Sequence, residues 1–292
     1  MALETTLTPR RPYSLALSAR MKSDATRVFR EGVLTMVFET EGSTALARAR
    51  QRPDGVVEIR VESDEPEAAV DKLRFVLAVD DEHEPFLRRF ERDPLLGPSV
   101  RGLAGLRPLR TATVTHALLK AVCGQLIQAK AARLLEARLM RMASLEAHGF
   151  RLPPTRQTFA RFAPAELARH GLVSRKATAL VRLSRELELE RLHGVESGAA
   201  CARLERERGL GPWSSGMVAL YGLGRFDRGL VGDLGLVKLV SALRGRWADA
   251  EDTRELLAPY GEWAGLASVY LLAGLPKQRR AGRPPRPIAA SA

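Results

Sequence analysis

The chain has 292 residues, of which 45% are hydrophobic and 27% charged, so it can bury one large core or two ordinary ones. The 46 Lys and Arg residues outnumber the 34 Asp and Glu residues and give a net charge of +12. This charge favours a polyanionic partner, with nucleic acid the first candidate and an anionic membrane surface the second. No stretch approaches the roughly 18 apolar residues of a membrane span, and no signal-peptide pattern opens the chain, so we expect a cytoplasmic protein.

The cysteine and histidine content predicts no metal site. Cys123 and Cys201 lie far apart in the sequence and are typical of reduced, buried thiols in the cytoplasm. The five histidines are scattered, and the chain contains neither an H-E-x-x-H nor a C-x-x-C motif.

The N-terminal part is predicted to be an antiparallel sheet domain over 13–100, preceded by a loose arm over 1–12. Val57, Ile59 and Val61 alternate with charged residues, as in a strand with one buried face. A Pro-Asp-Gly turn sequence lies just before them and predicts a hairpin. The expected elements are strands over 44–51 and 56–62, weaker strands over 13–17 and 33–38, and a helix opened by Pro66.

The remainder of the chain is predicted to be helical. Glycines and prolines between 97 and 108 indicate a domain boundary, with a helical domain over 101–276 and a basic, disordered tail over 277–292. The fold class is therefore α+β. The expected helices are 115–142 (broken near 124–128), 164–170, 174–190, 198–207, 212–221, 234–243, 252–259 and 263–272.

A short glycine motif lies between two of these helices. Gly209, Leu210 and Gly211 are followed by Pro212, a residue suited to the first turn of a helix. The glycines allow a tight turn, Leu210 can anchor it in the core, and the N–H groups that open the next helix suit a DNA phosphate. By itself the pattern is more typical of a plain helical hairpin.

The order of motifs around this hairpin is more specific. Asp233 comes 20 residues after Trp213, Trp263 comes 30 residues later still, and Gly124-Gln125 ends an upstream helix. This succession resembles the helix-hairpin-helix DNA glycosylase superfamily, and within it the bacterial 3-methyladenine DNA glycosylase II branch, which also carries an N-terminal sheet domain. The resemblance covers most of the helical part.

The resemblance implies a role for each residue at a matching position. Asp233 corresponds to the catalytic carboxylate, which stabilises the oxocarbenium character that develops on the sugar or also activates the attacking water, two roles that the sequence does not separate. Its alternative role is a helix N-cap. Leu126 corresponds to the wedge that replaces the flipped nucleotide. Gly209, Leu210 and Gly211 form the phosphate-binding hairpin. The implied base pocket consists of Trp213, Trp263, Met217, Leu234 and Gln125.

Three positions differ from relatives in the family and refine the expected chemistry. Met217 and Leu234 stand where known members of this branch carry tyrosines, which predicts a roomier and less aromatic pocket. Trp213 stands where bifunctional relatives carry a lysine, and an indole cannot form a Schiff base, so hydrolysis without strand cleavage is expected. Each tryptophan taken singly is more typical of a core residue.

The resemblance also implies what accompanies the protein. No cysteine follows Cys201, so the chain lacks the four cysteine ligands of the iron–sulfur cluster found in some relatives. We expect no cofactor, although the hairpin can accommodate a structural monovalent cation. The expected partner is duplex DNA with a damaged base, bound by a monomer. Two alternatives remain: a glycosylase of this fold for hypoxanthine or a mismatched base, and a noncatalytic DNA-binding protein, which would have no need of Asp233.

Overall fold

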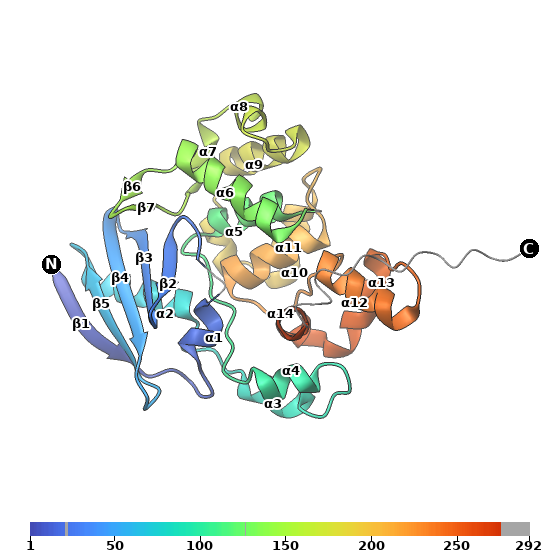
Figure 1. The fold of residues 1–292 in the computed structure, drawn as a ribbon. Coiled ribbons are helices and arrows are strands. Elements are labelled where there is room, and N and C mark those ends of the chain that lie inside the picture. The colour runs from blue at the N-terminus through green and yellow to red at the C-terminus, as the bar shows by residue number, and fades with distance from the viewer. Residues whose placement is uncertain (21–22, 126, 276–292) are drawn as a thin grey trace, which may run out of the picture.

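The computed structural model describes residues 1–20, 23–125 and 127–275. A twisted antiparallel sheet lies at one side of the molecule and the helices gather at the other (Figure 1). The strand order is β1-β5-β4-β3-β2. The strands are β1 (Ala2–Leu7), β2 (Arg27–Arg30), β3 (Val33–Thr40), β4 (Ser43–Gln51) and β5 (Val57–Glu62).

The predicted hairpin is confirmed by the pairing of β4 with β5. Ala47 lies opposite Val61 and Ala49 opposite Ile59, so the small residues of one strand pack beside the branched residues of the next. Burial alternates along β5 because successive side chains point to opposite faces of a sheet. The predicted strand over 33–38 is also present, within β3.

Two predictions for the first 20 residues are wrong. The arm over 1–12 contains β1, which pairs along its whole length with β5 and places Leu3 opposite Val61. An open β5 edge would leave its backbone groups unpaired, and β1 satisfies them. The strand expected over 13–17 is instead replaced by α1 (Leu15–Ala19), because the side chain of Ser14 accepts a hydrogen bond from the Leu17 N–H and caps a helix.

The sheet buries one face beneath α2 (Pro66–Leu77), which begins at Pro66 as predicted. Leu73 and Leu77 of this helix pack with the inward residues of β3, β4 and β5 in a single apolar cluster. The opposite face is covered in part by the short hairpin of β6 (Glu146–Ala147) and β7 (Phe150–Arg151).

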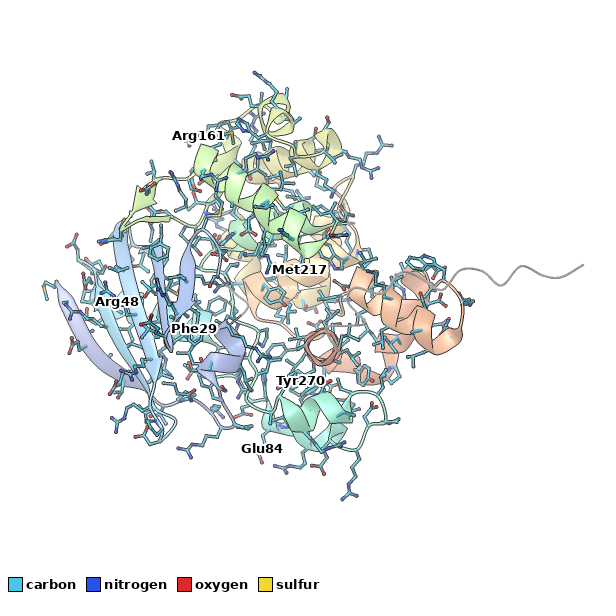
Figure 2. The ribbon with its side chains drawn as sticks, in the orientation of Figure 1. Phe29, Arg48, Glu84, Arg161, Met217 and Tyr270 are labelled. Atoms are coloured by element: carbon cyan, nitrogen blue, oxygen red, sulfur yellow. The ribbon has the colours of Figure 1, made fainter. Side chains whose placement is uncertain are left out.

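The predicted domain boundary lies too late in the chain. The helices α3 (Glu84–Phe90) and α4 (Gly97–Gly102) fall within the predicted sheet domain but pack with the C-terminal helices. Phe86 contacts Tyr270 of α14 (Ala264–Gly274), with ring centroids 5.1 Å apart. Figure 2 shows Tyr270 on the side of α14 that faces α3 and α4. Burial of aromatic rings holds this segment to the distant helices.

The other helices form the second layer, which surrounds two apolar clusters. The predicted break near 124–128 separates α5 from α6. Within the described residues no helix is both long and apolar enough to cross a membrane. The remaining helices are α5 (Val114–Gly124), α6 (Ala129–Ala143), α7 (Arg156–Ala160), α8 (Pro164–Arg169), α9 (Ser174–Glu186), η1 (Leu189–Gly194), α10 (Ser197–Glu205), α11 (Pro212–Val218), η2 (Ala219–Leu223), α12 (Leu234–Arg244), α13 (Ala250–Leu257) and η3 (Ala258–Trp263).

Candidate active site

The glycine motif forms the turn between α10 and α11. Gly209 has φ +104°, a conformation that favours glycine, and a side chain there would meet Arg175. Leu210 is buried in the helical core, as the sequence predicts. Gly211 has an extended conformation, and a Cβ on it would meet nothing within 4 Å. Only Gly209 therefore needs to be glycine for the turn itself, while Gly211 leaves the outer surface of the turn bare.

Asp233 lies at the start of α12 and accepts two hydrogen bonds. Its Oδ1 accepts from the Gly235 N–H at 2.8 Å, which makes it the N-cap of this helix. Its Oδ2 accepts from the indole Nε1–H of Trp213 at 3.0 Å. The N-cap role and a place beside Trp213 therefore coexist, and the two donors hold the carboxylate in one orientation.

Trp213 is also confined by the end of α5, which approaches the six-membered ring of its indole. A Cβ added at Gly124 would lie 2.8 Å from the Cη2 atom of the indole, which is too close without a shift. The sequence marked Gly124 only as part of a helix end. Its role here is to let the backbone of α5 approach the ring, a reason for glycine that no local pattern reveals.

Gln125 is the C-cap of α5 and is half-buried. The main-chain carbonyl oxygen of Gln125 accepts a hydrogen bond from Nζ of Lys176 at 2.9 Å, so a residue of α9 holds this end of α5 in place. Burial and the neighbouring Arg175 lower the pKa of Lys176. No sequence motif includes Lys176. The wedge prediction falls on Leu126, which lies outside the described residues.

The other predicted pocket residues lie around the same helices. Met217 is half-buried where the two helical clusters meet, near the centre of the helical part in Figure 2. Leu234 follows Asp233 directly and is 38% exposed. Trp263 packs in the same cluster as Trp213, but its ring contacts among the described residues are with Phe226, stacked at 6.1 Å, and Phe86, at 5.9 Å.

The structure thus brings the two most informative predicted residues into direct contact, Trp213 with Asp233. It places Gly124 against the same indole. The membership of Trp263, Met217, Leu234 and Gln125 in a base pocket stays a prediction. Phe226 and Phe86 were not singled out by the sequence, since isolated phenylalanines carry no motif.

This arrangement suits chemistry that develops positive charge. A carboxylate fixed by two donors presents negative charge at one point beside an electron-rich ring. Both features stabilise a cation placed next to them, the carboxylate by charge and the indole by its π face.

Comparisons with known proteins agree on the kind of fold. No family model matches the sequence. The DNA-3-methyladenine glycosylase of Bacillus subtilis (strain 168) is 28% identical over 205 residues, 66% of this chain and 67% of the relative. The solved 3-methyladenine DNA-glycosylase from Archaeoglobus fulgidus has a TM-score of 0.77 at 23% identity, covering 92% of this chain and 97% of that chain.

A second solved structure with this fold carries a different activity in its name. It is the 8-oxoguanine glycosylase/lyase of Clostridium acetobutylicum in complex with double-stranded DNA, with a TM-score of 0.72 and 19% identity over 89% of this chain and 91% of that chain. At such identities the solved structures establish the fold, while the sequence relative and the order of the motifs indicate the family. The chain thus shares its fold with these solved DNA glycosylases, and over about two thirds of its length its sequence is similar to a DNA-3-methyladenine glycosylase.

Proposed function

We propose that the protein is a monofunctional DNA glycosylase that hydrolyses the N-glycosidic bond of alkylated purines in duplex DNA. The observation that carries the proposal is the hydrogen bond from Trp213 to Asp233. It puts an indole, which has no nucleophilic amine, beside the carboxylate that corresponds to the family's catalytic aspartate.

The reaction follows from the chemistry of these two groups. Breaking the bond between base and sugar leaves oxocarbenium character on the sugar, and Asp233 supplies the stabilising negative charge. Water then attacks the sugar. Because Trp213 cannot attack the sugar and form a Schiff base, the strand stays intact and the product is an abasic site.

The substrate class follows from charge and from the named relative. A purine alkylated at N3 or N7 is cationic, so it gains from contact with an aromatic face and needs little protonation to leave. The Bacillus subtilis relative is named for 3-methyladenine. Met217 and Leu234, in place of tyrosines, widen the pocket and broaden the expected range of alkylated purines.

The test is a panel of duplexes that each carry one damaged base, incubated with the protein and then cleaved with alkali at abasic sites. We expect fast release of 3-methyladenine, slower release of 7-methylguanine and little release of 8-oxoguanine, which is neutral. No protein–DNA adduct should be trapped by borohydride.

A different result would contradict the monofunctional chemistry, the substrate class and the catalytic activity. Borohydride trapping with strand scission would refute the monofunctional assignment. Efficient release of 8-oxoguanine, hypoxanthine or a mismatched base, with none from methylated DNA, would refute the substrate class. Duplex binding without release of any base would instead support a noncatalytic DNA-binding protein.

The two hairpin glycines should respond differently to the same substitution. Gly209→Val should destabilise the fold by about 1–3 kcal/mol, because its φ of +104° strains any side chain. Gly211→Val should destabilise the fold less, since Gly211 has an extended backbone, but it should weaken binding to damaged and undamaged duplex alike, because the new side chain covers the bare surface that a phosphate approaches. Urea denaturation and duplex titration measure the two effects. Loss of lesion preference alone in Gly211→Val would contradict the phosphate-binding role.

A further inference from the structure

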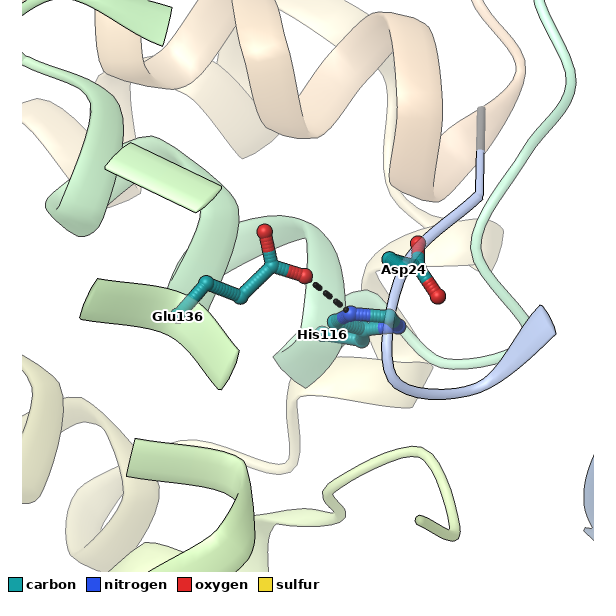
Figure 3. A group of neighbouring side chains, drawn as sticks. All are labelled: Asp24, His116 and Glu136. Atoms are coloured by element: carbon teal, nitrogen blue, oxygen red, sulfur yellow. Dashed lines mark hydrogen bonds and ion pairs between the residues drawn. The ribbon is translucent and has the colours of Figure 1, made fainter. Parts of the chain in front are cut away.

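A buried group of charged side chains joins the sheet side of the molecule to α5 and α6. Nζ of Lys120 lies 2.8 Å from Oδ2 of Asp24 and 2.7 Å from Oε1 of Glu136. Nε2 of His116 lies 2.9 Å from the same Glu136 oxygen. Figure 3 shows Asp24, His116 and Glu136 converging from three separate segments. We call Asp24, Arg27, His116, Lys120 and Glu136 the α5 charge network.

The charges of the α5 charge network balance. Arg27 approaches Asp24 at 3.5 Å, so two cations face two carboxylates whose side chains are each 6% exposed. Burial would raise the pKa of both carboxyls, but Lys120 beside them lowers the pKa of each. Burial and Lys120 lower the pKa of His116, which keeps the ring neutral and makes Nε2 the donor to Glu136.

Three members of the network, Asp24, His116 and Glu136, have side chains of the kinds that bind metal ions. Their donor atoms lie within 4.8 Å of one another. Nζ of Lys120, however, contacts an oxygen of both carboxylates. The ammonium group therefore already supplies the positive charge that a bound cation would bring. We interpret the cluster as an ion-pair network and not as a metal centre.

The α5 charge network is connected to the candidate active site along α5, because Lys120 lies one helical turn before Gly124 on the same face of this helix. One side of α5 presents His116 and Lys120 to Asp24 and Glu136, while Val114 and Val122 pack in the cluster that contains Val218 of α11. The last residue of α5, Gly124, lies against the indole of Trp213. A displacement of α5 would therefore move one wall of the Trp213 site.

We propose that Lys120 is a positioning residue that fixes the placement of α5, and through Gly124 the placement of the Trp213 indole on Asp233. This inference rests on the proposed function, in which Trp213 and Asp233 act on the flipped nucleotide. Lys120 itself contacts neither residue in the described structure.

The physical reason lies in the difference between apolar and charged contacts. Apolar faces of helices repack at modest cost, so the α5–α11 contact alone tolerates small displacements of α5. A lysine between two carboxylates that are each 6% exposed has one favourable geometry, because a shift leaves a nearly buried carboxylate without its partner. The α5 charge network thus selects one position for a helix that apolar packing leaves less defined.

The test compares Lys120→Met with Lys120→Arg and with a matched ion-pair control. The control is Asp81→Asn, which removes the charge of a second buried pair, Asp81 with Arg110, 2.6 Å apart and 13% and 8% exposed. Neither residue belongs to the α5 charge network, although the main-chain oxygen of Arg110 accepts from Arg27. Two readouts are used on the full chain. One is the single-turnover rate of base release, at a temperature where every variant is folded. The other is the fluorine resonance of Trp213 in protein labelled with 5-fluorotryptophan, identified among the three tryptophans by its loss in Trp213→Phe.

Lys120→Met should slow base release about tenfold at unchanged duplex affinity and should shift the Trp213 resonance. Lys120→Arg, which restores the charge, should recover most of the rate. Asp81→Asn should lower the melting temperature with less than a twofold change in rate and no shift of the resonance. If Lys120→Met does not fold, Glu136→Gln keeps the volume and provides the same comparison.

The proposal is overturned if Lys120→Met behaves like Asp81→Asn, with lower stability but an unmoved resonance and rate. It is also overturned if Lys120→Arg shows no recovery. If the parent chain releases no base from any duplex, the proposed function fails. The resonance comparison then still decides whether the α5 charge network positions Trp213.

Discussion

Replacing Asp233 by asparagine is expected to slow base release by at least about 100-fold, with duplex affinity close to that of the parent protein. The substitution keeps the shape of the side chain and removes its charge. Asparagine is also a good N-cap, so the start of α12 should be preserved. Single-turnover release of 3-methyladenine and titration with an undamaged duplex measure the two quantities.

Asp249→Asn is the matched control for this variant. Asp249 is the N-cap of α13, as Asp233 is of α12, and its side chain accepts from the Asp252 N–H. Within the described residues Asp249 makes no hydrogen bond to Trp213, so its substitution should leave the rate of base release unchanged. Parent-like release by Asp233→Asn, or an equal loss in both variants, would show that Asp233 is not the catalytic carboxylate.

Replacing Gly124 by alanine is expected to reduce base release by one to two orders of magnitude with at most a modest loss of stability. The added Cβ would lie 2.8 Å from Cη2 of Trp213, so the indole must move and its hydrogen bond to Asp233 must lengthen or break. Displacement of a positioned group by about 1 Å can cost about 100-fold in rate. Overpacking at this contact costs about 1–3 kcal/mol, and the preference of alanine over glycine for the helix, up to about 1 kcal/mol, offsets part of that cost.

Gly102→Ala is the control for the helix propensity of Gly124→Ala. Gly102 is the last residue of α4, and an added Cβ there would meet nothing within 4 Å. It should gain the same helical preference with no change in base release. Thermal melts and single-turnover kinetics on both variants separate the two effects. Unchanged release by Gly124→Ala would show that the position of the Trp213 ring does not limit the reaction.

Periodicity and turn chemistry determined much of the fold from sequence alone. The β4–β5 hairpin follows from the alternation of Val57, Ile59 and Val61 after a Pro-Asp-Gly turn, because one face of a strand must be buried. The helix opened by Pro66 follows in the same way, since proline suits the first turn of a helix. The break after Gly124 was also predicted. In each case the signal and the structure it specifies lie within a few residues of each other.

The candidate site was predicted as a set of residues, and the contacts within it were not. The order of Gly124, the hairpin, Asp233 and Trp263 indicated the family from the spacing of its motifs. The spacing of motifs along the chain does not specify which side chains meet in space. The sequence therefore did not predict that Trp213 donates to Asp233 or that Gly124 lies against the ring. A hydrogen bond between residues 20 apart depends on how α11 and α12 pack, and no local pattern encodes it.

Only the tertiary structure decided the features that join distant parts of the chain. β1 becomes a strand because β5 offers it an unpaired edge, and α3 and α4 join the C-terminal helices because Phe86 packs against Tyr270. In the sequence Lys120 is an ordinary lysine of an apolar helix, yet in the fold it pairs with both Asp24 and Glu136. Each outcome depends on a partner far away in the sequence, because burial and charge pairing are properties of neighbours in space, which only the folded chain brings together.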